Sequence, residues 1–382
     1  MTESTIISNV KSTHKVDTFI LRPEHITRHQ NADSLSIVRI PGMEYTCIIK
    51  TDDWKDKLNT LVAYVQPDSI VDVKRPEFAF LGEKGGRIKA KKLRGVVSFG
   101  LLVPAEGYGL KEGDCAKNVL AVEHYDPEEA AVKNAGKRGL FTGGEVGKPP
   151  SGVYPKYDVE NAYKYAKTVF NEGEVCYVSL KIHGANGRFV FQNSEFFCGS
   201  RGEWKKEYTS APKITLEELI EKTGDKVRAE EIYNRNVVNF KSQKNMWWKV
   251  LDETPKLKEY LVRNPGVAVY GEVYGQIQKG FPYDCKPGES KFRAFDILKE
   301  GQWLGAEEFI RICDENEIPR VPLIGFIPFN FEKLVELSQK SDVLNSEHLE
   351  EGIVIKPLTE RWHEKLGRVS LKLVNPKFLE SS

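Results

Sequence analysis

The sequence has few cysteines, and none of them forms a metal-binding pattern. Its six cysteines lie far apart in a chain of 382 residues, with no C-x-x-C pair and no pair of histidines nearby. Structural zinc sites need such ligands at short spacings, and disulfide frameworks are typical of short, cysteine-rich secreted chains. We therefore expect no structural zinc, no disulfides and a reduced, intracellular protein.

Long apolar runs and a secretory leader are also missing. No segment approaches the roughly 20 apolar residues of a membrane-spanning helix, and the N-terminus MTESTIISNV lacks the basic and apolar regions of a signal peptide. We therefore expect no membrane partner. The charge is nearly balanced, with 56 basic and 55 acidic side chains, so any basic patch must be local.

The chain does have the composition of a soluble, globular protein, with 40% apolar and 29% charged residues, and its length favours two domains. Short β-rich runs separated by Gly, Pro, Asn and Asp predict a small barrel or sandwich first. A stretch rich in glycine and proline follows, and then helical and strand patterns alternate. We predict a β domain at 1–125, a linker at 126–156 and a mixed domain at 157–382.

One basic segment lies between two of the predicted N-terminal strands. The stretch EKGGRIKAKKLRG, Glu83 to Gly95, carries six basic side chains. Basic β surfaces often follow the phosphates of nucleic acids, but a solvated hairpin also uses such charges to prevent pairing with another strand. Both interpretations stay open. In the first, the nucleic-acid-binding side chains are Arg87, Lys89, Lys91, Lys92 and Arg94.

The stretch VSLKIHGANGRF, Val178 to Phe189, places a lysine at the end of a predicted strand. Most lysines in such a place are surface charges. As a nucleophile Lys181 must be neutral, and lowering its pKa by about three units from a reference near 10.4 takes about 4 kcal/mol. Desolvation or neighbouring cations supply this, and a phosphate-binding site contains such cations. Gly184 would let the backbone approach a nucleotide closely.

Five more motifs follow in order: SRG at 200–202, VYGEVYG at 269–275, FRAFDIL at 292–298, EEGIVIKP at 350–357 and SLKLVNPKF at 370–378. Together with KIHGAN they resemble the motifs of the covalent nucleotidyltransferases, the superfamily of polynucleotide ligases and capping enzymes. KIHGAN, FRAFDI and EEGIVIKP are similar to the RNA ligase 2 family. HQNADSLSIVRI and KLRGVVSFGLLVP resemble the N-terminal OB domain of one branch of RNA ligases.

This resemblance implies an α+β fold. An ATP-grasp-like nucleotidyltransferase domain of antiparallel sheets flanked by helices would follow a small, OB-like β-barrel. It also implies an ATP-dependent RNA ligase that joins 3′-OH and 5′-phosphate ends through lysyl-AMP and an adenylylated RNA 5′ end. The expected substrates are ATP and RNA ends, the latter in a nicked duplex. Mg²⁺ or Mn²⁺ would be the cofactor, and the protein would be a monomer.

The resemblance further assigns roles to single residues. Lys181 would attack the α-phosphate, His183 would help the sealing steps, and Lys372 would supply charge at the α-phosphate. Glu351 and Glu272 would hold the metal. The nucleotide-binding set would comprise Lys181, Gly184, Asn186, Arg201, Glu272, Phe295 and Lys356, with Phe295 stacked on adenine. Without the resemblance, these would be ordinary core residues and strand-end charges.

One position departs from the family pattern. The last motif, SLKLVNPKF, corresponds to motif V of these enzymes, which usually carries two lysines as K-x-K, but here the second position is Val374. Loss of one preorganised contact costs about 3 kcal/mol, roughly a hundredfold in rate, unless Lys377 or Arg368 replaces it. Val374 supports one alternative, an RNA-binding homologue with impaired chemistry. The other alternative is a DNA ligase or capping-type transferase, which nucleotide choice and polynucleotide choice would distinguish.

Overall fold

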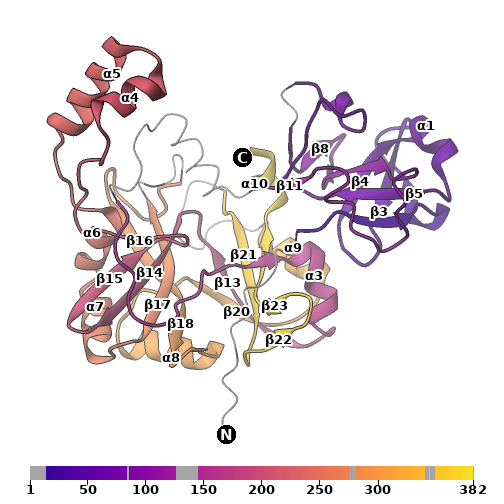
Figure 1. Cartoon of the computed structure of the whole chain (residues 1–382). Helices are drawn as coiled ribbons and strands as arrows, with labels where there is room; N and C mark the ends of the chain where they lie inside the picture. Colours follow the sequence, from indigo (N-terminus) through magenta and orange to yellow (C-terminus); the bar gives the residue numbers. More distant parts are fainter. Residues whose placement is uncertain are drawn as a thin grey trace, which may run out of the picture.

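The computed structural model contains two groups of sheets that share a core (Figure 1). The structure describes residues 14–83, 86–125, 145–275, 277, 281–339, 344 and 349–381. No helix in these ranges is both long enough and apolar enough to cross a membrane.

Short strands make up the N-terminal part of the chain. They are β1 (Asp17–Ile20), β2 (Ile26–Arg28), β3 (Leu35–Arg39), β4 (Thr46–Lys50), β5 (Leu61–Val65), β6 (Ser69–Ile70), β7 (Arg87–Ile88), β8 (Lys91–Leu93), β9 (Val96–Ser98), β10 (Leu101–Pro104) and β11 (Glu123–His124). Short helical turns between them are η1 (Pro23–His25), α1 (Thr51–Trp54), η2 (Lys55–Lys57) and η3 (Ala79–Leu81).

These N-terminal strands form four separate sheets, in the orders β1-β5-β10, β2-β3-β4, β11-β6-β7 and β8-β9. Within the described ranges, hydrogen bonding does not close them into one ring. The expected N-terminal β domain is therefore present as four small sheets, and its closure into a barrel is not shown. Several of the strands have only two or three residues, which is too short for a continuous ladder around a barrel.

The C-terminal part contains two larger sheets. The first has the order β12-β24-β21-β13-β20 and the second β16-β15-β14-β17-β18-β19. The strands of the first are β12 (Glu160–Asn161), β13 (Val175–Lys181), β20 (Leu323–Pro328), β21 (Gly352–Pro357) and β24 (Leu371–Val374). Those of the second are β14 (Ala185–Gln192), β15 (Glu195–Gly199), β16 (Trp204–Lys205), β17 (Ala268–Gly275), β18 (Ser290–Lys299) and β19 (Gln302–Trp303), and a separate hairpin consists of β22 (Trp362–His363) and β23 (Gly367–Arg368).

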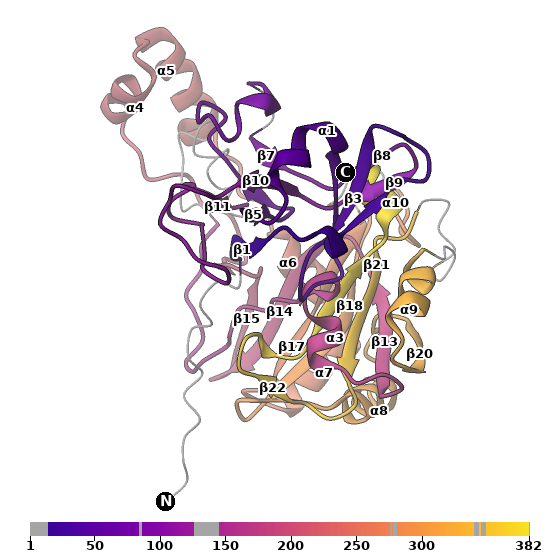
Figure 2. The same ribbon diagram turned by 90° about the vertical axis from the view of Figure 1, so that its right-hand side faces the viewer.

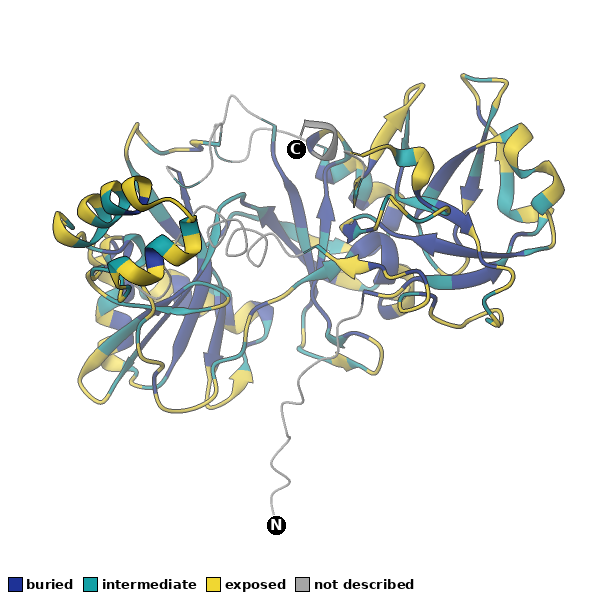
Figure 3. Cartoon of the chain, turned by 45° about the horizontal axis from the view of Figure 1, so that its top comes forward, coloured by how far each residue is buried: buried dark blue, intermediate teal, exposed yellow. Residues whose placement is uncertain are grey.

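Helices cover these sheets, as the α+β expectation required. They are α3 (Ala162–Val169), α4 (Leu216–Thr223), α5 (Lys226–Tyr233), the π-helix η4 (Asn234–Val238), α6 (Met246–Asp252), α7 (Pro255–Arg263), α8 (Ala306–Glu315), α9 (Phe331–Ser338) and α10 (Pro376–Ser381). The pair α4 and α5 extends away from both sheets and is largely exposed (Figures 1 and 3). Thr215 begins α4 with a capping box to Glu218, and Gly224 ends it in the left-handed conformation.

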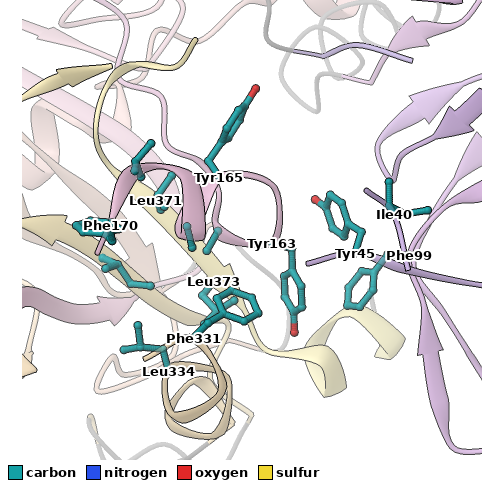
Figure 4. Packing of buried hydrophobic residues seen from close by; sticks show 14 of the residues in the cluster. Ile40, Tyr45, Phe99, Tyr163, Tyr165, Phe170, Phe331, Leu334, Leu371 and Leu373 are labelled. Carbon is teal, nitrogen blue, oxygen red and sulfur yellow. The ribbon is translucent and has the colours of Figure 1, made fainter. Parts of the chain in front are cut away.

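One apolar core joins the N-terminal strands to the first large sheet. Tyr163 of α3 stacks on Tyr45 with ring centroids 5.7 Å apart and lies 4.6 Å from Phe99 (Figure 4). The backbone N–H of Glu44 donates to the Tyr163 carbonyl at 2.6 Å. Because α3 also packs on β24, the shared core brings the N-terminal sheets close to that strand. The turned view shows the N-terminal strands next to α3 (Figure 2).

A buried histidine, His14, makes the N-terminal part sensitive to acid. The rings of His14 and His124 lie 4.7 Å apart, and Ser69 Oγ is 3.0 Å from His14 Nε2. Burial, followed by the charge of His124, lowers the pKa of His14 from 6.5 to about 3. Between pH 6.5 and about pH 3, His14 therefore carries a proton in the unfolded chain but not in the folded chain. The free energy of unfolding decreases as the pH falls below 6.5.

We expect His14→Gln to remove part of this acid sensitivity. Between about pH 7.5 and pH 5, wild type should lose about 2 kcal/mol more free energy of unfolding than the variant. Urea unfolding at both pH values measures the difference, and glutamine keeps a polar group near Ser69. Equal losses in the two proteins would contradict the assignment to His14.

Candidate active site between the two large sheets

Lys181 lies at the C-terminal end of β13, inside the first large sheet. Strand pairing puts it opposite Gly352 of β21, and Gly352 lies opposite Val374 of β24. Directly paired residues point to the same face of a sheet, so Lys181 and Val374 share a face. Gly352 has a φ of +146°, and a Cβ there would lie 2.2 Å from the carbonyl oxygen of Leu373, so this central position requires glycine.

Glu351 directly precedes β21 and brings two of the expected catalytic side chains together. Its Oε2 lies 2.9 Å from Lys181 Nζ and 3.3 Å from His183 Nδ1. The Glu351 side chain is 11% exposed, so little water screens these charges. The Glu351 carboxylate therefore links Lys181 to His183 through one oxygen.

The carboxylates in this cluster control the protonation of Lys181. Burial lowers the pKa of the Lys181 ammonium, but the charges of Glu351 and Glu272 outweigh burial and raise it above its usual value. Burial raises the pKa of the Glu351 carboxyl, but Lys181 and His183 bring it below its usual value. The sequence argument required desolvation or neighbouring cations to lower the lysine pKa. Burial acts in that direction here, but the charged neighbours are carboxylates and the net shift of the pKa is upward.

Gly184 and Asn186 connect Lys181 to the second large sheet. A Cβ at Gly184 would lie 2.3 Å from the carbonyl oxygen of Val273, so the close approach is made by strand β17. Asn186 pairs with Glu272 across β14 and β17. Its Oδ1 is buried and, within the described part of the chain, has no hydrogen-bond partner. Trp247 Nε1 donates to the Asn186 carbonyl at 3.0 Å and fixes this strand.

Three side chains surround His183. The Tyr283 hydroxyl accepts the His183 backbone N–H at 2.7 Å. The rings of Phe281 and Phe378 meet the imidazole edge-on, with centroids 4.8 Å and 5.2 Å away. His183 is thus held both by its backbone and by its ring.

Phe295 and Lys356 belong to a buried ionic cluster around Asp296. Lys356 Nζ lies 2.7 Å from Asp296 Oδ2 and donates to the Phe295 carbonyl at 2.8 Å. Arg368 also lies 2.7 Å from Asp296, and the Tyr157 hydroxyl donates to the same carboxylate. Burial raises the pKa of the Asp296 carboxyl, but Arg368 and Lys356 outweigh it and lower the pKa below its usual value.

This cluster also defines where Lys356 and Arg368 lie. Lys356 pairs with Tyr177, four residues before Lys181, and so lies about 13 Å along the strand from the nucleophile. It holds the backbone of Phe295, whose ring is 4.5 Å from that of Tyr157. Arg368 is committed to Asp296 and Glu360, which argues against its replacing the lysine absent at Val374.

Lys372 and Arg201 lie on two sides of the site. Lys372 pairs with Val354, which pairs with Ser179, so it shares the face of Lys181 about 7 Å along the strands. Arg201 forms an ion pair with Asp158. Lys377, the other possible replacement for the missing lysine, is exposed on α10.

The basic N-terminal residues are all exposed, on β7, on β8 and in the segments that flank them. Arg87 forms an ion pair with Asp68 at 3.0 Å and lies over the ring of Tyr125. Strand β8 lies next to α10, at the end of the motif V strand (Figure 1). The expected Lys91 and Lys92 are therefore on the side of the N-terminal sheets that borders the site.

The acidic residues of the site suit a hydrated cation that enters with a nucleotide. No group of three or more His, Cys, Asp or Glu capable of holding a metal occurs among the described residues. Magnesium commonly uses one or two carboxylates together with substrate phosphates and water. Glu351 and Glu272 provide two carboxylates, and the buried Asn186 Oδ1, which has no hydrogen-bond partner within the described ranges, would accept from metal-bound water.

Sequence reasoning missed several residues that shape this site. Asp296 stands within the quoted FRAFDIL motif, and an acid in an apolar strand was a usable signal for a buried ion pair. Tyr157, Tyr283 and Phe378 had no such signal, because their contacts join segments far apart in the chain.

Comparison with known proteins identifies the family. The RNA ligase family matches residues 174–374, more than half of the chain, and an OB-fold domain matches residues 19–105. No curated protein sequence matches this chain.

Solved RNA ligase structures from Naegleria gruberi have the same fold. One lysine-to-alanine variant with ATP and Mn is 19% identical, covers 96% of this chain and 98% of its own, and has a TM-score of 0.67. A glutamate-to-alanine variant with AMP and Mn is 20% identical, covers 94% and 96%, and has a TM-score of 0.66. Another lysine-to-alanine variant, in the apo form, is 19% identical, covers 97% and 99%, and has a TM-score of 0.68.

These identities are low enough that the structural likeness establishes the fold alone. The family match adds the sequence evidence, and it spans the segment from β13 to β24 that carries Lys181, Glu272, Glu351 and Lys372. The expected family and the N-terminal OB-fold domain are both confirmed. The chain belongs to the RNA ligase family.

Proposed function

We propose that this protein is an ATP-dependent RNA ligase that joins 3′-OH and 5′-phosphate ends. The observation that carries the proposal is the buried Glu351 carboxylate shared by Lys181 and His183, in a chain of the RNA ligase family. The N. gruberi ligases that bind ATP or AMP and Mn support the choice of nucleotide and metal.

In the first step, the neutral amine of Lys181 attacks the α-phosphorus of ATP. The Nζ–P bond forms, the P–O bond to pyrophosphate breaks, and the nitrogen loses its proton to give lysyl-AMP. The RNA 5′-phosphate then takes the AMP and releases the lysine, and the 3′-OH displaces AMP to form the phosphodiester. Each step is a displacement at phosphorus, so catalysis depends mainly on fixed charges around the phosphates.

The remaining residues bind and orient the substrates. Phe295 stacks on adenine, and Lys356 acts through the Phe295 backbone that it holds. Lys372 and Arg201 contact phosphates, and Glu272 accepts from ribose hydroxyls or supports the metal. His183 assists the sealing steps.

Lys181 must lose a proton before it attacks, and Glu351 and Glu272 oppose this loss. Glu351 and Glu272 would hold a divalent cation, which would supply positive charge against these carboxylates and the ATP phosphates. The two carboxylates would then raise the lysine pKa less, and burial would favour the neutral amine that attack requires.

RNA reaches this site along the N-terminal domain. The exposed Arg87, Lys89, Lys91, Lys92 and Arg94 form its phosphate-binding side, next to α10. We further propose a monomer divided into an OB-fold domain at 1–125, a linker at 126–156 and a catalytic domain at 157–382. Nicked duplex RNA is the substrate class that we would test first.

Covalent labelling tests the proposed chemistry. Purified protein is incubated with α-labelled ATP or GTP and Mg²⁺, denatured and separated on a gel, with Lys181→Ala as control. Label from ATP alone is expected, followed by sealing of nicked RNA in preference to nicked DNA. Label from GTP would favour a capping-type enzyme, and sealing of DNA alone a DNA ligase. Folded, AMP-free protein that takes no label would favour an impaired RNA-binding homologue.

Val374 is the observation that favours an impaired RNA-binding homologue, and Val374→Lys tests its effect on labelling. A lysine there would add a cation on the Lys181 face, which both stabilises phosphate charge and lowers the lysine pKa. We expect labelling to become about tenfold faster, which is less than the roughly hundredfold or more that one fully preorganised contact provides. Val374→Leu, which changes shape without charge, is the matched control. Equal rates in the two variants would contradict the prediction.

A further inference from the structure

The turn that follows the motif V strand is tied to the backbone of Glu351. Asn375 is completely buried and its N–H donates to the Glu351 carbonyl at 2.8 Å. Its Nδ2 donates to the Glu350 carbonyl at 3.2 Å. These bonds extend the pairing of β21 and β24 beyond Gly352 and Val374, so the chain on both sides of Glu351 is fixed.

The same turn also places a ring against His183. The Phe378 N–H donates to the Asn375 carbonyl at 3.0 Å, which fixes the start of α10. The Phe378 ring is 5% exposed and lies edge-on to His183, at an interplanar angle of 70°. Phe281 contacts both rings, so the imidazole lies against a pair of aromatic side chains.

Two independent contacts from this turn therefore meet at one point. Asn375 acts on Glu351, Phe378 acts on His183, and Glu351 Oε2 is the atom that His183 and Lys181 share. Strand β8 of the N-terminal domain lies against α10, so the turn is supported from its outer side as well.

We propose that the turn from Asn375 to Phe378 is a positioning element of the active site. The Asn375 N–H holds the Glu351 backbone and the Phe378 ring contacts the His183 ring, so that both side chains face Lys181. Asn375 and Phe378 touch no reacting atom in this proposal, which rests on the proposed ligase function for its effect on rate. Simple core packing predicts a loss of stability only, whereas positioning predicts that the effect of Phe378 depends on His183.

A double-mutant cycle separates these two roles. Phe378→Leu keeps apolar bulk but removes the ring, and we expect single-turnover sealing of nicked RNA to slow about tenfold, as for a modest misplacement of a catalytic group. In the His183→Ala background, the same change should slow sealing by less than about twofold. The single variant Phe378→Tyr keeps the ring and should therefore retain about half of the wild-type sealing rate or more.

The matched control is Phe189→Leu, which truncates a buried ring in a different core cluster. Its effect should be the same in both His183 backgrounds. Equal slowing by Phe378→Leu with and without His183, or no slowing at all, would overturn the proposal. If Phe378→Leu is unfolded by circular dichroism, Phe281→Leu takes its place, because it removes the other ring against His183.

A spectroscopic measurement keeps the proposal testable even in a protein without ligase activity. The His183 ring resonances are assigned in ¹³C-histidine-labelled protein by their loss in His183→Ala. Glu351→Gln should shift them in otherwise wild-type protein, and by less than half as much when Phe378 is leucine. Equal shifts would overturn the positioning role, whereas absent labelling with a normal NMR result would overturn only the proposed function.

Discussion

Replacing Lys181 by alanine is expected to abolish covalent labelling by α-labelled ATP, at least about a thousandfold, because no other group replaces a missing nucleophile. The change removes the only side chain that we assign to the phosphoramidate bond. Lys181→Arg should be equally inactive, although it keeps the positive charge beside Glu351. Rapid-quench labelling with gel separation measures both variants.

The control for this prediction is another lysine on the same face. Lys372 lies opposite Val354, which in turn lies opposite Ser179, two residues before Lys181. Lys372→Ala should slow labelling by about a hundredfold, the cost of one charged contact, but should not prevent it. If label survives in Lys181→Ala and disappears in Lys372→Ala, the nucleophile has been assigned to the wrong strand.

Asp296→Asn is expected to destabilise the protein by about 3–5 kcal/mol, because it leaves buried charges without their counter-ion. The side chains of Lys356 and Arg368 are 6% and 11% exposed, so water cannot replace the carboxylate. The variant should also bind ATP more weakly, because Lys356 fixes the backbone of Phe295. Urea unfolding and the KM for ATP in the labelling reaction measure these two effects.

The pH dependence of this loss gives a second check. Because the folded-state pKa of Asp296 lies below its unfolded value, its stabilisation is complete above about pH 4 and disappears as the pH falls through the folded value. Wild type and Asp296→Asn should therefore converge in strong acid. Glu315→Gln, which breaks an exposed pair with Arg311, should cost less than about 1 kcal/mol. A similar small cost at Asp296 would contradict the buried-cluster argument.

Much of the fold was accessible from local patterns. Alternating apolar residues and turn signals predicted strands such as β13 and β21, and helical spacing predicted α8 and α9. Closure of the barrel is not shown, because it depends on hydrogen bonds between short strands that are distant in sequence, and the described strands pair into four small sheets. The shared core of Tyr45, Phe99 and Tyr163 also had no local signal.

The site was predictable in its members but not in its electrostatics. Ordered motifs named Lys181, Glu272 and Glu351 as a set, and strand pairing brings them together. The raised pKa of Lys181 had no signal in the sequence, because it depends on which charges lie within a few ångströms after burial. Lys356 illustrates the same limit, since its motif position says nothing about the ion pair with Asp296.

The sequence by itself determined the order of the motifs, the family and the absence of a second lysine at Val374. The tertiary structure alone decided that Glu351 is shared by Lys181 and His183, that Arg368 is committed to Asp296, and that the turn after β24 reaches His183. The reason is physical. A motif fixes which groups are available, but cross-strand register and burial fix their distances, and electrostatic interactions depend on distance and on the exclusion of water.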